Sequence, residues 1–366
     1  MKKYLLISLS TGGGHASVAG SLAERLKEKG HEVLVIDLFK KIDAKGLDRI
    51  ICGGYNLIAT KIPKVYGTVY RTGNRPTFAK SSFDLTRRIC QKKIRELISI
   101  YNPDIIIAVH PIVTDILGGM KEKSYLGKEK IVSVITDYLS HYVYIRKNQF
   151  IDAYIVGSEV TEKDLLRKGV CPDKIYAYGI PIRKEFYSPR AKSANNNKIF
   201  TILVMGGSLG SKHMDRVIKA LFSVKEPLKL NIVCGRDEEL KARMEKFVNA
   251  DKSKEVVAYG FTDQVYSLMD GADLLVSKPG GASVTEALLR GIPMIIPYLI
   301  GGQEKENLDY LVEEEVALWV GNTKNIPSIV EELLAKPEIL EKMKRNMAQL
   351  SENFSMEKVI NKLEEL

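Results

Sequence analysis

One pattern occurs twice in this chain and limits the folds that it can adopt. Residues 3–9 and 200–205 are apolar runs of strand length, and each leads into a glycine-rich loop. Apolar residues at helical spacing follow each loop. They are Val18, Leu22 and Leu26 in the first half, and Met214, Val217, Ile218 and Leu221 in the second. Alternating strands and helices predict parallel sheets with crossover helices. We therefore expect an α/β protein with two similar domains.

Further apolar runs extend this alternation along the chain. The predicted strands are 3–9, 32–38, 104–109, 130–136, 153–156, 175–178, 200–205, 274–276 and 293–297. A length of 366 residues exceeds what one hydrophobic core usually organises. Two prolines and a polar run before residue 199 have the composition of a linker. We predict domains at 1–185 and 199–340, a linker at 186–198, and C-terminal helices at 341–366 that are candidates for packing on the first domain.

Ligands of open parallel sheets bind outside the carboxyl ends of the strands. We therefore expect the active site between the two halves.

The first apolar run stops after six residues, so we interpret it as a strand and not as a leader. The longest apolar stretches, such as 105–109 and 292–300, fall short of the ~20 residues that cross a bilayer, and we expect no transmembrane helix. Four scattered cysteines suit the reduced thiols of a cytoplasmic protein.

The net charge of +10 is concentrated in one stretch. Residues 56–95 contain ten basic residues and one acidic residue, with aromatic side chains between them. Such a surface suits anionic lipid headgroups, although nucleic acid also accepts this charge and a solvated basic face is the plainer alternative. The candidate membrane and acceptor residues here are Tyr66, Tyr70, Arg71, Arg75, Phe78, Arg87 and Arg88.

The first chemical motif is the segment 10–15, Ser-Thr-Gly-Gly-Gly-His, between a strand and a helix. Its glycines, including Gly13 and Gly14, allow close approach of a ligand, but it matches neither the dinucleotide fingerprint nor the P-loop. His15 is a candidate general base, because an ordinary imidazole pKa near 6.5 permits proton transfer at neutral pH. The alternative is a histidine that only caps or packs.

The second motif, residues 277–287, follows a predicted strand and opens a helix. Backbone N–H groups at such a position can bind a diphosphate. Its candidate donor-binding residues are Lys278, Gly280, Gly281, Ala282 and Ser283. Glu286 would repel a diphosphate unless it accepted hydrogen bonds from neutral hydroxyls such as a ribose diol. The alternative is an ordinary first-turn glutamate stabilised by the helix dipole.

Two more loops complete the candidate donor site. Residues 301–307 combine two glycines with Gln303, Glu304 and Asn307, which suits the hydroxyls of a hexose, although a turn before a charged helix start is the alternative. The loop after 200–205 can contact phosphate or acceptor through Gly206, Gly207, Ser208 and Gly210. No Asp-x-Asp occurs in the chain, which argues against a carboxylate-bound metal and for backbone amides at the diphosphate.

Taken together, the motifs resemble a family of GT-B glycosyltransferases. The family includes monogalactosyldiacylglycerol synthase, processive diacylglycerol glucosyltransferase and, more distantly, the N-acetylglucosaminyltransferase of peptidoglycan synthesis. The matching segments are 11–15, 134–137, 179–183, 278–281 and 302–307. The resemblance implies two Rossmann-like domains facing each other across a cleft, and inverting transfer from UDP-glucose or UDP-galactose to the hydroxyl of diacylglycerol. It also implies no catalytic metal or other cofactor, no nucleic acid, and a peripheral position on an anionic surface at the inner face of the cell membrane.

The resemblance also assigns roles to individual residues. His15 would take the proton from the lipid hydroxyl, and Asp137 would orient His15 or line the acceptor channel, with His141 nearby in sequence. Glu286 would hold the ribose, and Gln303 and Glu304 would contact the sugar. Phe261 and Thr262 would border the uracil, and the basic stretch 56–95 would meet the membrane.

Three other functions stay open at this point. The first is transfer of N-acetylglucosamine to a polyprenyl-linked acceptor. The second is a UDP-sugar epimerase on the same fold, and the third is a non-catalytic nucleotide-sugar sensor. Glucose and galactose cannot be told apart, because they differ in the orientation of one hydroxyl.

Overall fold

A computed structural model describes residues 1–9, 13–38, 84–190, 199–207, 211–299 and 302–366. The chain divides into two compact units. The first comprises Met1–Lys184, Gly301–Gln303 and Asn353–Leu366, and the second comprises Glu185–Ile300 and Glu304–Glu352. Each unit has its own sheet and core.

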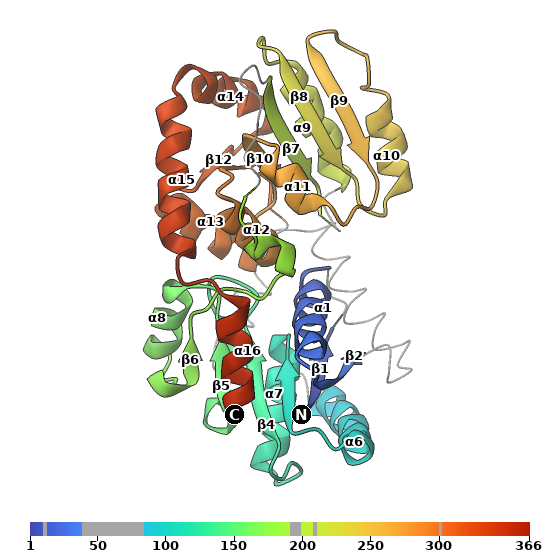
Figure 1. Ribbon diagram of the computed structural model, residues 1–366, viewed down its shortest axis with the longest axis vertical. Helices are drawn as coiled ribbons and strands as arrows, with labels where there is room; N and C mark the ends of the chain where they lie inside the picture. Colours follow the sequence, from blue (N-terminus) through green and yellow to red (C-terminus); the bar gives the residue numbers. More distant parts are fainter. Residues whose placement is uncertain (10–12, 39–83, 191–198, 208–210, 300–301) are drawn as a thin grey trace. The chain divides into compact units, whose positions relative to one another are not determined.

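The described part of the first unit contains a six-stranded parallel sheet with the order β2-β1-β3-β4-β5-β6 (Figure 1). The strands are β1 (Lys3–Ser8), β2 (Glu32–Asp37), β3 (Ile105–Ala108), β4 (Lys130–Val134), β5 (Ala153–Ile155) and β6 (Ile175–Tyr176). The chain first adds β2 on one side of β1 and then returns to add β3 on the other. In open parallel sheets, ligands bind at such a reversal, which here lies at the carboxyl ends of β1 and β3.

Helices cover this sheet because each carries one apolar face. They are α1 (Gly13–Glu28), α6 (Asp84–Tyr101), α7 (Pro111–Glu122), α8 (Glu159–Arg167) and α16 (Met356–Glu365). The predicted helix positions Val18, Leu22 and Leu26 are fully buried. Proline at the start of α7 suits a first helical turn, where its missing N–H leaves no bond unmade.

The second unit repeats the arrangement in its described residues, with the strand order β12-β11-β10-β7-β8-β9. Its strands are β7 (Phe200–Met205), β8 (Leu228–Val233), β9 (Lys254–Tyr259), β10 (Leu274–Ser277), β11 (Met294–Ile296) and β12 (Ala317–Trp319). Here the reversal lies between β7 and β10, where Ser277 pairs with Met205. Both sheets are parallel, so the predicted α/β class with two Rossmann-like domains is confirmed.

The helices of the second unit follow its strands in the usual alternation. They are α9 (Ser211–Phe222), α10 (Glu238–Glu245), α11 (Val265–Asp270), α12 (Gly281–Arg290), α13 (Gln303–Glu313), α14 (Ile326–Ala335) and α15 (Pro337–Ser351). The apolar positions predicted for α9 (Met214, Val217, Ile218 and Leu221) are at most 1% exposed.

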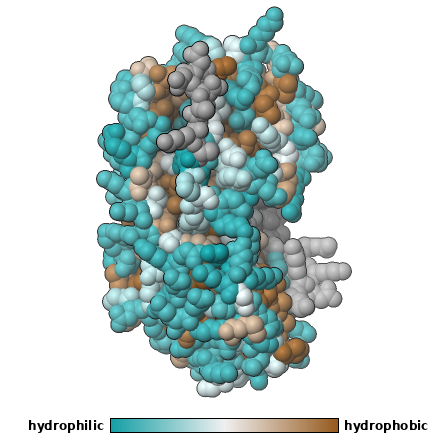
Figure 2. Space-filling view, viewed as in Figure 1, coloured by the Kyte–Doolittle hydropathy of each residue, from teal (hydrophilic) through white to brown (hydrophobic). Residues whose placement is uncertain are grey.

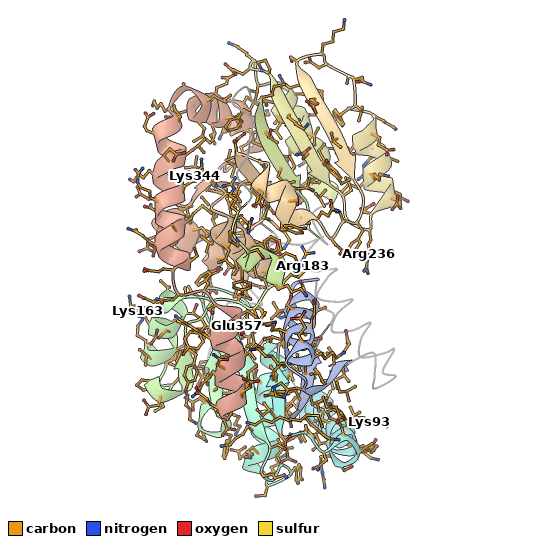
Figure 3. The ribbon with its side chains drawn as sticks, viewed as in Figure 1. Lys93, Lys163, Arg183, Arg236, Lys344 and Glu357 are labelled. Atoms are coloured by element: carbon orange, nitrogen blue, oxygen red, sulfur yellow. The ribbon has the colours of Figure 1, made fainter. Side chains whose placement is uncertain are left out.

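The two C-terminal helices belong to different units. The apolar side of α15 joins the core of the second unit through Leu340 and Met343. Only α16 packs on the first unit, where Tyr4 Oη donates to Leu363 O at 3.3 Å. Arg25 Nε of α1 also donates to Glu357 Oε1 at 2.7 Å (Figure 3).

The predicted linker 186–198 begins later than expected. Phe186 is 1% exposed, and the Arg290 guanidinium donates to Ser188 O at 2.6 Å. The first residues of that segment are therefore part of the second unit, and 191–198 lie outside the described residues.

Hydrophilic residues cover most of the face seen in Figure 2, with small hydrophobic areas between them. Within the described ranges, no helix is both long and apolar enough to cross a membrane.

Candidate functional site

The candidate residues of the first unit lie in loops that leave the carboxyl ends of β1, β3 and β4. His15 follows β1, His110 follows β3, and Thr136 follows β4. Because the carboxyl ends of parallel strands share one edge, the fold brings these three residues together at the reversal beside β1.

His15 is held by two contacts from this edge. Its Nδ1 lies 3.1 Å from Thr136 Oγ1, and its ring meets that of His110 edge to face, with 4.8 Å between centroids. The imidazole is partly buried and lies in the first turn of α1. These contacts fix the ring orientation, so the predicted base has a defined position.

Burial lowers the pKa of His15 from 6.5 to about 4, and a hydrogen bond with the Val109 backbone acts weakly in the opposite direction. A positive imidazolium loses hydration in this place and is disfavoured. At neutral pH the ring is therefore neutral, which is the form that can accept a proton.

His110 is a site residue that the sequence analysis missed. It is 7% exposed and caps α7, because its Nδ1 accepts a hydrogen bond from Ile112 N at 3.2 Å. Burial lowers its pKa well below the usual value, and the neighbouring His15 and His141 lower it further. Its position directly after a buried strand was the available signal.

Acid is expected to destabilise the first unit through His15. The unfolded chain binds a proton on this ring near pH 6.5 and the folded chain only near pH 4. The contribution of the neutral ring to the free energy of unfolding is therefore fully present above pH 6.5 and is lost as the pH falls toward 4. Allowing for partial exposure, we expect a loss of roughly 1–2 kcal/mol by about pH 5. Urea unfolding from about pH 7 to 5 should show a steeper decline for the wild type than for His15→Gln. Parallel declines would contradict the lowered pKa.

Four further candidate residues of this unit lie within the described ranges. Gly13 and Gly14 open α1 and are exposed. Asp137 follows Thr136, is partly exposed, and raises the pKa of the buried Tyr144 through its charge, after burial itself. His141 caps a short 3-10 helix by accepting from Val143 N at 3.2 Å.

Several residues predicted to contact the membrane or the phosphates lie outside the described residues. Ser208 and Gly210 lie outside the described residues, as do Tyr66, Tyr70, Arg71, Arg75 and Phe78. The side chains of Arg87 and Arg88 are outside it as well, although their backbone belongs to α6.

In the second unit, Gly207 and Lys278 meet at the reversal between β7 and β10. Gly207 has a φ of 62°, a left-handed conformation that favours glycine. A Cβ there would lie 2.8 Å from Lys278 Cε, so a larger residue would displace the lysine. The glycine therefore lets the lysine stem pass close to the backbone at Gly207.

Lys278 is tied to the first turn of α13. Its Nζ donates to Glu304 Oε1 at 2.5 Å, and both side chains are largely buried. Asn307 Nδ2, also buried, donates to Pro279 O at 2.9 Å. The structure thus joins three residues of two predicted motifs, with Gln303 as the first residue of α13.

The start of α12 carries no side-chain cap. Gly280 is the N-cap residue and makes no capping hydrogen bond, so the first helical N–H groups, at Gly281, Ala282 and Ser283, have no intrahelical acceptor. Together with the helix dipole, such a start favours an anion. The Lys278 ammonium, paired with Glu304, lies beside this helix start, where a Cβ on Gly280 would be 3.3 Å from its Nζ.

Glu286 lies in the second turn of α12 and is 8% exposed. The alternative of an ordinary first-turn glutamate favoured by the helix dipole is therefore wrong, because the first turn contains no acidic residue. A carboxylate this deeply buried needs hydrogen-bonding partners.

Phe261 and Thr262 follow β9, two strands from β7 or about 10 Å along the sheet. Phe261 is 60% exposed, and the guanidinium of Arg236 lies 4.7 Å from the centre of its ring. Arg236 is labelled in Figure 3. Thr262 Oγ1 accepts from Gln264 N at 3.1 Å. Arg236 was not predicted, since its contact with Phe261 depends on the pairing of β8 with β9.

Two aromatic residues support the loop after β7. Tyr298 Oη donates to Gly206 O at 3.2 Å, and the His213 ring stacks on Tyr298 with 4.3 Å between centroids.

Over the described part of the chain, no group of three or more His, Cys, Asp or Glu residues could hold a metal ion.

Comparison with known proteins identifies both halves. The model of the monogalactosyldiacylglycerol (MGDG) synthase family matches residues 15–182, and the model of the glycosyltransferase family 28 C-terminal domain matches residues 201–363. Among curated relatives, a processive diacylglycerol beta-glucosyltransferase of Bacillus pumilus is 28% identical, with 100% of this chain and 95% of that protein covered. A chloroplastic monogalactosyldiacylglycerol synthase of Spinacia oleracea is 26% identical, with 100% of this chain and 72% of that protein covered.

Solved structures show the same fold at lower identity. MurG of Acinetobacter baumannii superimposes with a TM-score of 0.68 at 15% identity, with 100% of both chains covered. Anabaena HepE in complex with UDP and glucose gives a TM-score of 0.59 at 15% identity, again with 100% of both chains covered. From the two matched family models and the full-length relatives, the chain is a glycosyltransferase that belongs to the monogalactosyldiacylglycerol synthase and processive diacylglycerol glucosyltransferase family.

Proposed function

We propose that this glycosyltransferase moves a hexose, glucose or galactose, from a UDP-sugar to the free hydroxyl of 1,2-diacylglycerol with inversion at the anomeric carbon. No metal takes part in the proposed reaction, and the enzyme works as a peripheral protein on the inner face of the cell membrane. The names of its relatives support the lipid acceptor.

The observation that carries the proposal is the neutral, oriented imidazole of His15. In the proposed step this ring accepts the proton of the acceptor hydroxyl while the hydroxyl oxygen bonds to the anomeric carbon. The bond between that carbon and the diphosphate oxygen breaks, and UDP departs with the electron pair. A neutral ring is needed at the start, and the lowered pKa of His15 supplies it.

The second unit provides the groups that suit a nucleotide diphosphate. The uncapped start of α12 and the Lys278 ammonium both favour the negative charge that grows on the leaving UDP. Glu286 is the proposed acceptor for the ribose hydroxyls, and Phe261 borders the uracil. Glu304, which accepts a hydrogen bond from Lys278, is proposed to orient the sugar together with Gln303.

Transfer of radiolabel tests the proposal directly. UDP-glucose and UDP-galactose, each labelled in the sugar, are offered separately to the full chain with diacylglycerol in anionic liposomes and excess chelator. We expect chelator-resistant label in a lipid that contains one of the two hexoses. Liposomes without diacylglycerol are the control and should remain unlabelled.

Other outcomes would replace the proposal. Label that appears only with UDP-N-acetylglucosamine and a polyprenyl-linked acceptor would change both substrates. UDP-sugar that binds without transfer to any acceptor would indicate a sensor, and conversion of the donor without acceptor would indicate an epimerase. Loss of transfer with chelator would contradict the metal-free mechanism.

A further inference from the structure

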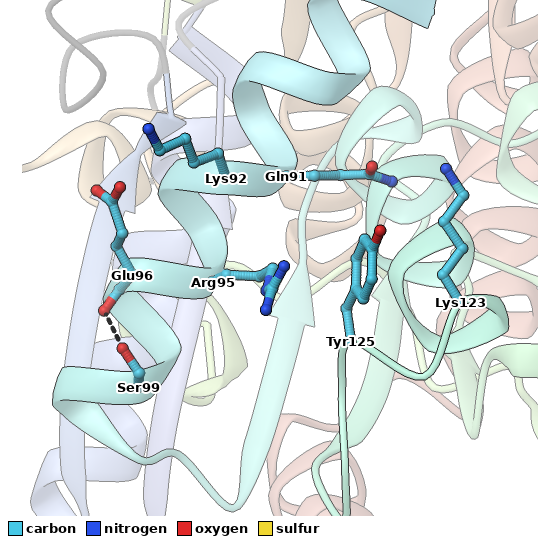
Figure 4. A pocket seen from close by; sticks show the side chains of 7 residues that line it. All are labelled: Gln91, Lys92, Arg95, Glu96, Ser99, Lys123 and Tyr125. Carbon is cyan, nitrogen blue, oxygen red and sulfur yellow. Dashed lines mark hydrogen bonds between the residues drawn. The ribbon is translucent and has the colours of Figure 1, made fainter.

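A hollow on the first unit lies at the amino ends of two strands of the sheet, whereas His15 lies at the carboxyl ends. It is lined by one side of α6 and by the turn that follows α7, and its volume is about 680 Å³ (Figure 4). The lining residues are Gln91, Lys92, Arg95, Glu96, Ser99, Lys123 and Tyr125. The second half of α6 leads into the start of β3, and the end of α7 leads into the start of β4, so the hollow lies at the amino ends of these strands.

The charges around the hollow are mostly positive. Three cations line it, at Lys92, Arg95 and Lys123, against one carboxylate, Glu96. That carboxylate already pairs with Lys93 at 3.1 Å. Of the carboxylates beyond the lining, Glu122 is bound by Lys147 at 2.6 Å. Positive charge therefore dominates the space.

Arg95 is prepared to bind a planar or tetrahedral anion. Its guanidinium lies 4.5 Å from the centre of the Tyr125 ring, and Figure 4 shows the two side chains directed toward each other. Stacking on a ring holds the guanidinium plane and leaves its N–H groups available at the edge. Guanidinium edges match the oxygens of a phosphate.

The side-chain amide of Gln91 gives a second, independent reason to expect a ligand in the hollow. It lines the hollow and is 5% exposed, yet its Nε2 has no hydrogen-bond partner among the described residues. A buried amide nitrogen without a partner is costly in a native structure and calls for an acceptor. An oxyanion in the hollow is such an acceptor.

We propose that this hollow binds a phosphate group, through Arg95, Lys123 and the Gln91 amide, at a site separate from the donor and acceptor sites. The phosphate belongs either to a soluble phosphate compound or to a lipid headgroup. The separation follows from the topology, because His15 lies at the carboxyl ends of the strands and the hollow at their amino ends.

Calorimetric titration with inorganic phosphate tests the site, with saturating UDP present so that the donor site is occupied. Arg95→Ala and Lys123→Ala should each weaken phosphate binding about 10- to 100-fold. Lys163→Ala removes the same charge from the exposed face of α8, where Lys163 pairs with Glu159 at 3.7 Å outside the lining of the hollow, and should leave the affinity within about twofold. Gln91→Leu should weaken phosphate binding while the unfolding midpoint stays equal or rises, since an unpartnered buried amide is removed.

Sedimentation with phosphatidylcholine vesicles, with and without phosphatidate, distinguishes the two sources. Phosphatidate-dependent binding that Arg95→Ala abolishes and free phosphate reverses identifies a headgroup. Arg95-dependent phosphate binding without any effect of phosphatidate identifies a soluble ligand. Phosphate and phosphatidate binding that is unchanged in Arg95→Ala, or equally reduced in Lys163→Ala, would overturn the proposal, and neither result depends on which sugar the enzyme transfers.

Discussion

Replacing His15 by alanine is expected to lower kcat about 10²- to 10⁴-fold, which is the range that general-base assistance contributes. The acceptor hydroxyl would then have no neutral imidazole to take its proton. UDP binding should be unchanged, because the groups proposed for UDP belong to the second unit and His15 to the first. Steady-state transfer assays and calorimetric UDP titration of the same preparations measure both quantities.

Two further measurements separate a base from a structural histidine. The wild-type kcat/KM should hold down to about pH 5 and fall only toward pH 4, because burial keeps the pKa of His15 at about 4. Thr136→Val removes the hydroxyl that lies 3.1 Å from Nδ1, so kcat should fall more modestly, by roughly tenfold. A fall of kcat/KM centred at pH 6.5, or full turnover in His15→Ala, would show that His15 is not the general base.

Arg290→Met is expected to destabilise the second unit by about 3–5 kcal/mol, the usual cost of breaking a buried ion pair from one side. The Arg290 side chain is 2% exposed, and its Nε donates to Asp270 Oδ1 at 2.7 Å. It also donates to the carbonyl oxygens of Ser188 and Phe186. The substitution leaves the Asp270 carboxylate buried with most of its compensating charge removed.

Arg190 offers a matched control at the same aspartate. Its Nε lies 3.9 Å from Asp270 Oδ1, and its guanidinium donates to the carbonyl oxygens of Arg290, Asp270 and Ala272 at 3.1–3.2 Å, but its side chain is 38% exposed. Arg190→Met should therefore cost less than Arg290→Met, about 1–2 kcal/mol. The chain has one tryptophan, Trp319, in β12 of the second unit, and its fluorescence during urea unfolding follows that unit. Equal losses in the two variants would show that burial of Arg290 does not set the effect.

The fold was largely predictable because its strands are short apolar runs with clear ends. Residues 200–205 form β7 as predicted, and the other predicted strands match within two residues at each end. Apolar spacing likewise placed the buried side of α9. These features depend on local sequence, where strand and helix periodicities differ.

The contacts of the candidate site were less predictable, because they depend on strand order. His15 and His110 are 95 positions apart and meet only because β3 pairs with β1. Lys278 reaches Glu304 across 26 positions for a similar reason. Strand order is set by tertiary packing, and neither periodicity nor glycine spacing encodes it. The division of α15 and α16 between two cores also depends on which apolar faces fit together.

The placement of α16 has a consequence for how the protein is made. The second unit, Glu185–Ile300 and Glu304–Glu352, is almost wholly inserted in sequence between the body of the first unit and its last helix. A ribosome therefore finishes the second unit before it releases α16, whose Val359 and Ile360 are fully buried in the first. Until then the face of the first unit that receives Leu363 beside Tyr4 stays uncovered. The half that is synthesised first is the half that is completed last.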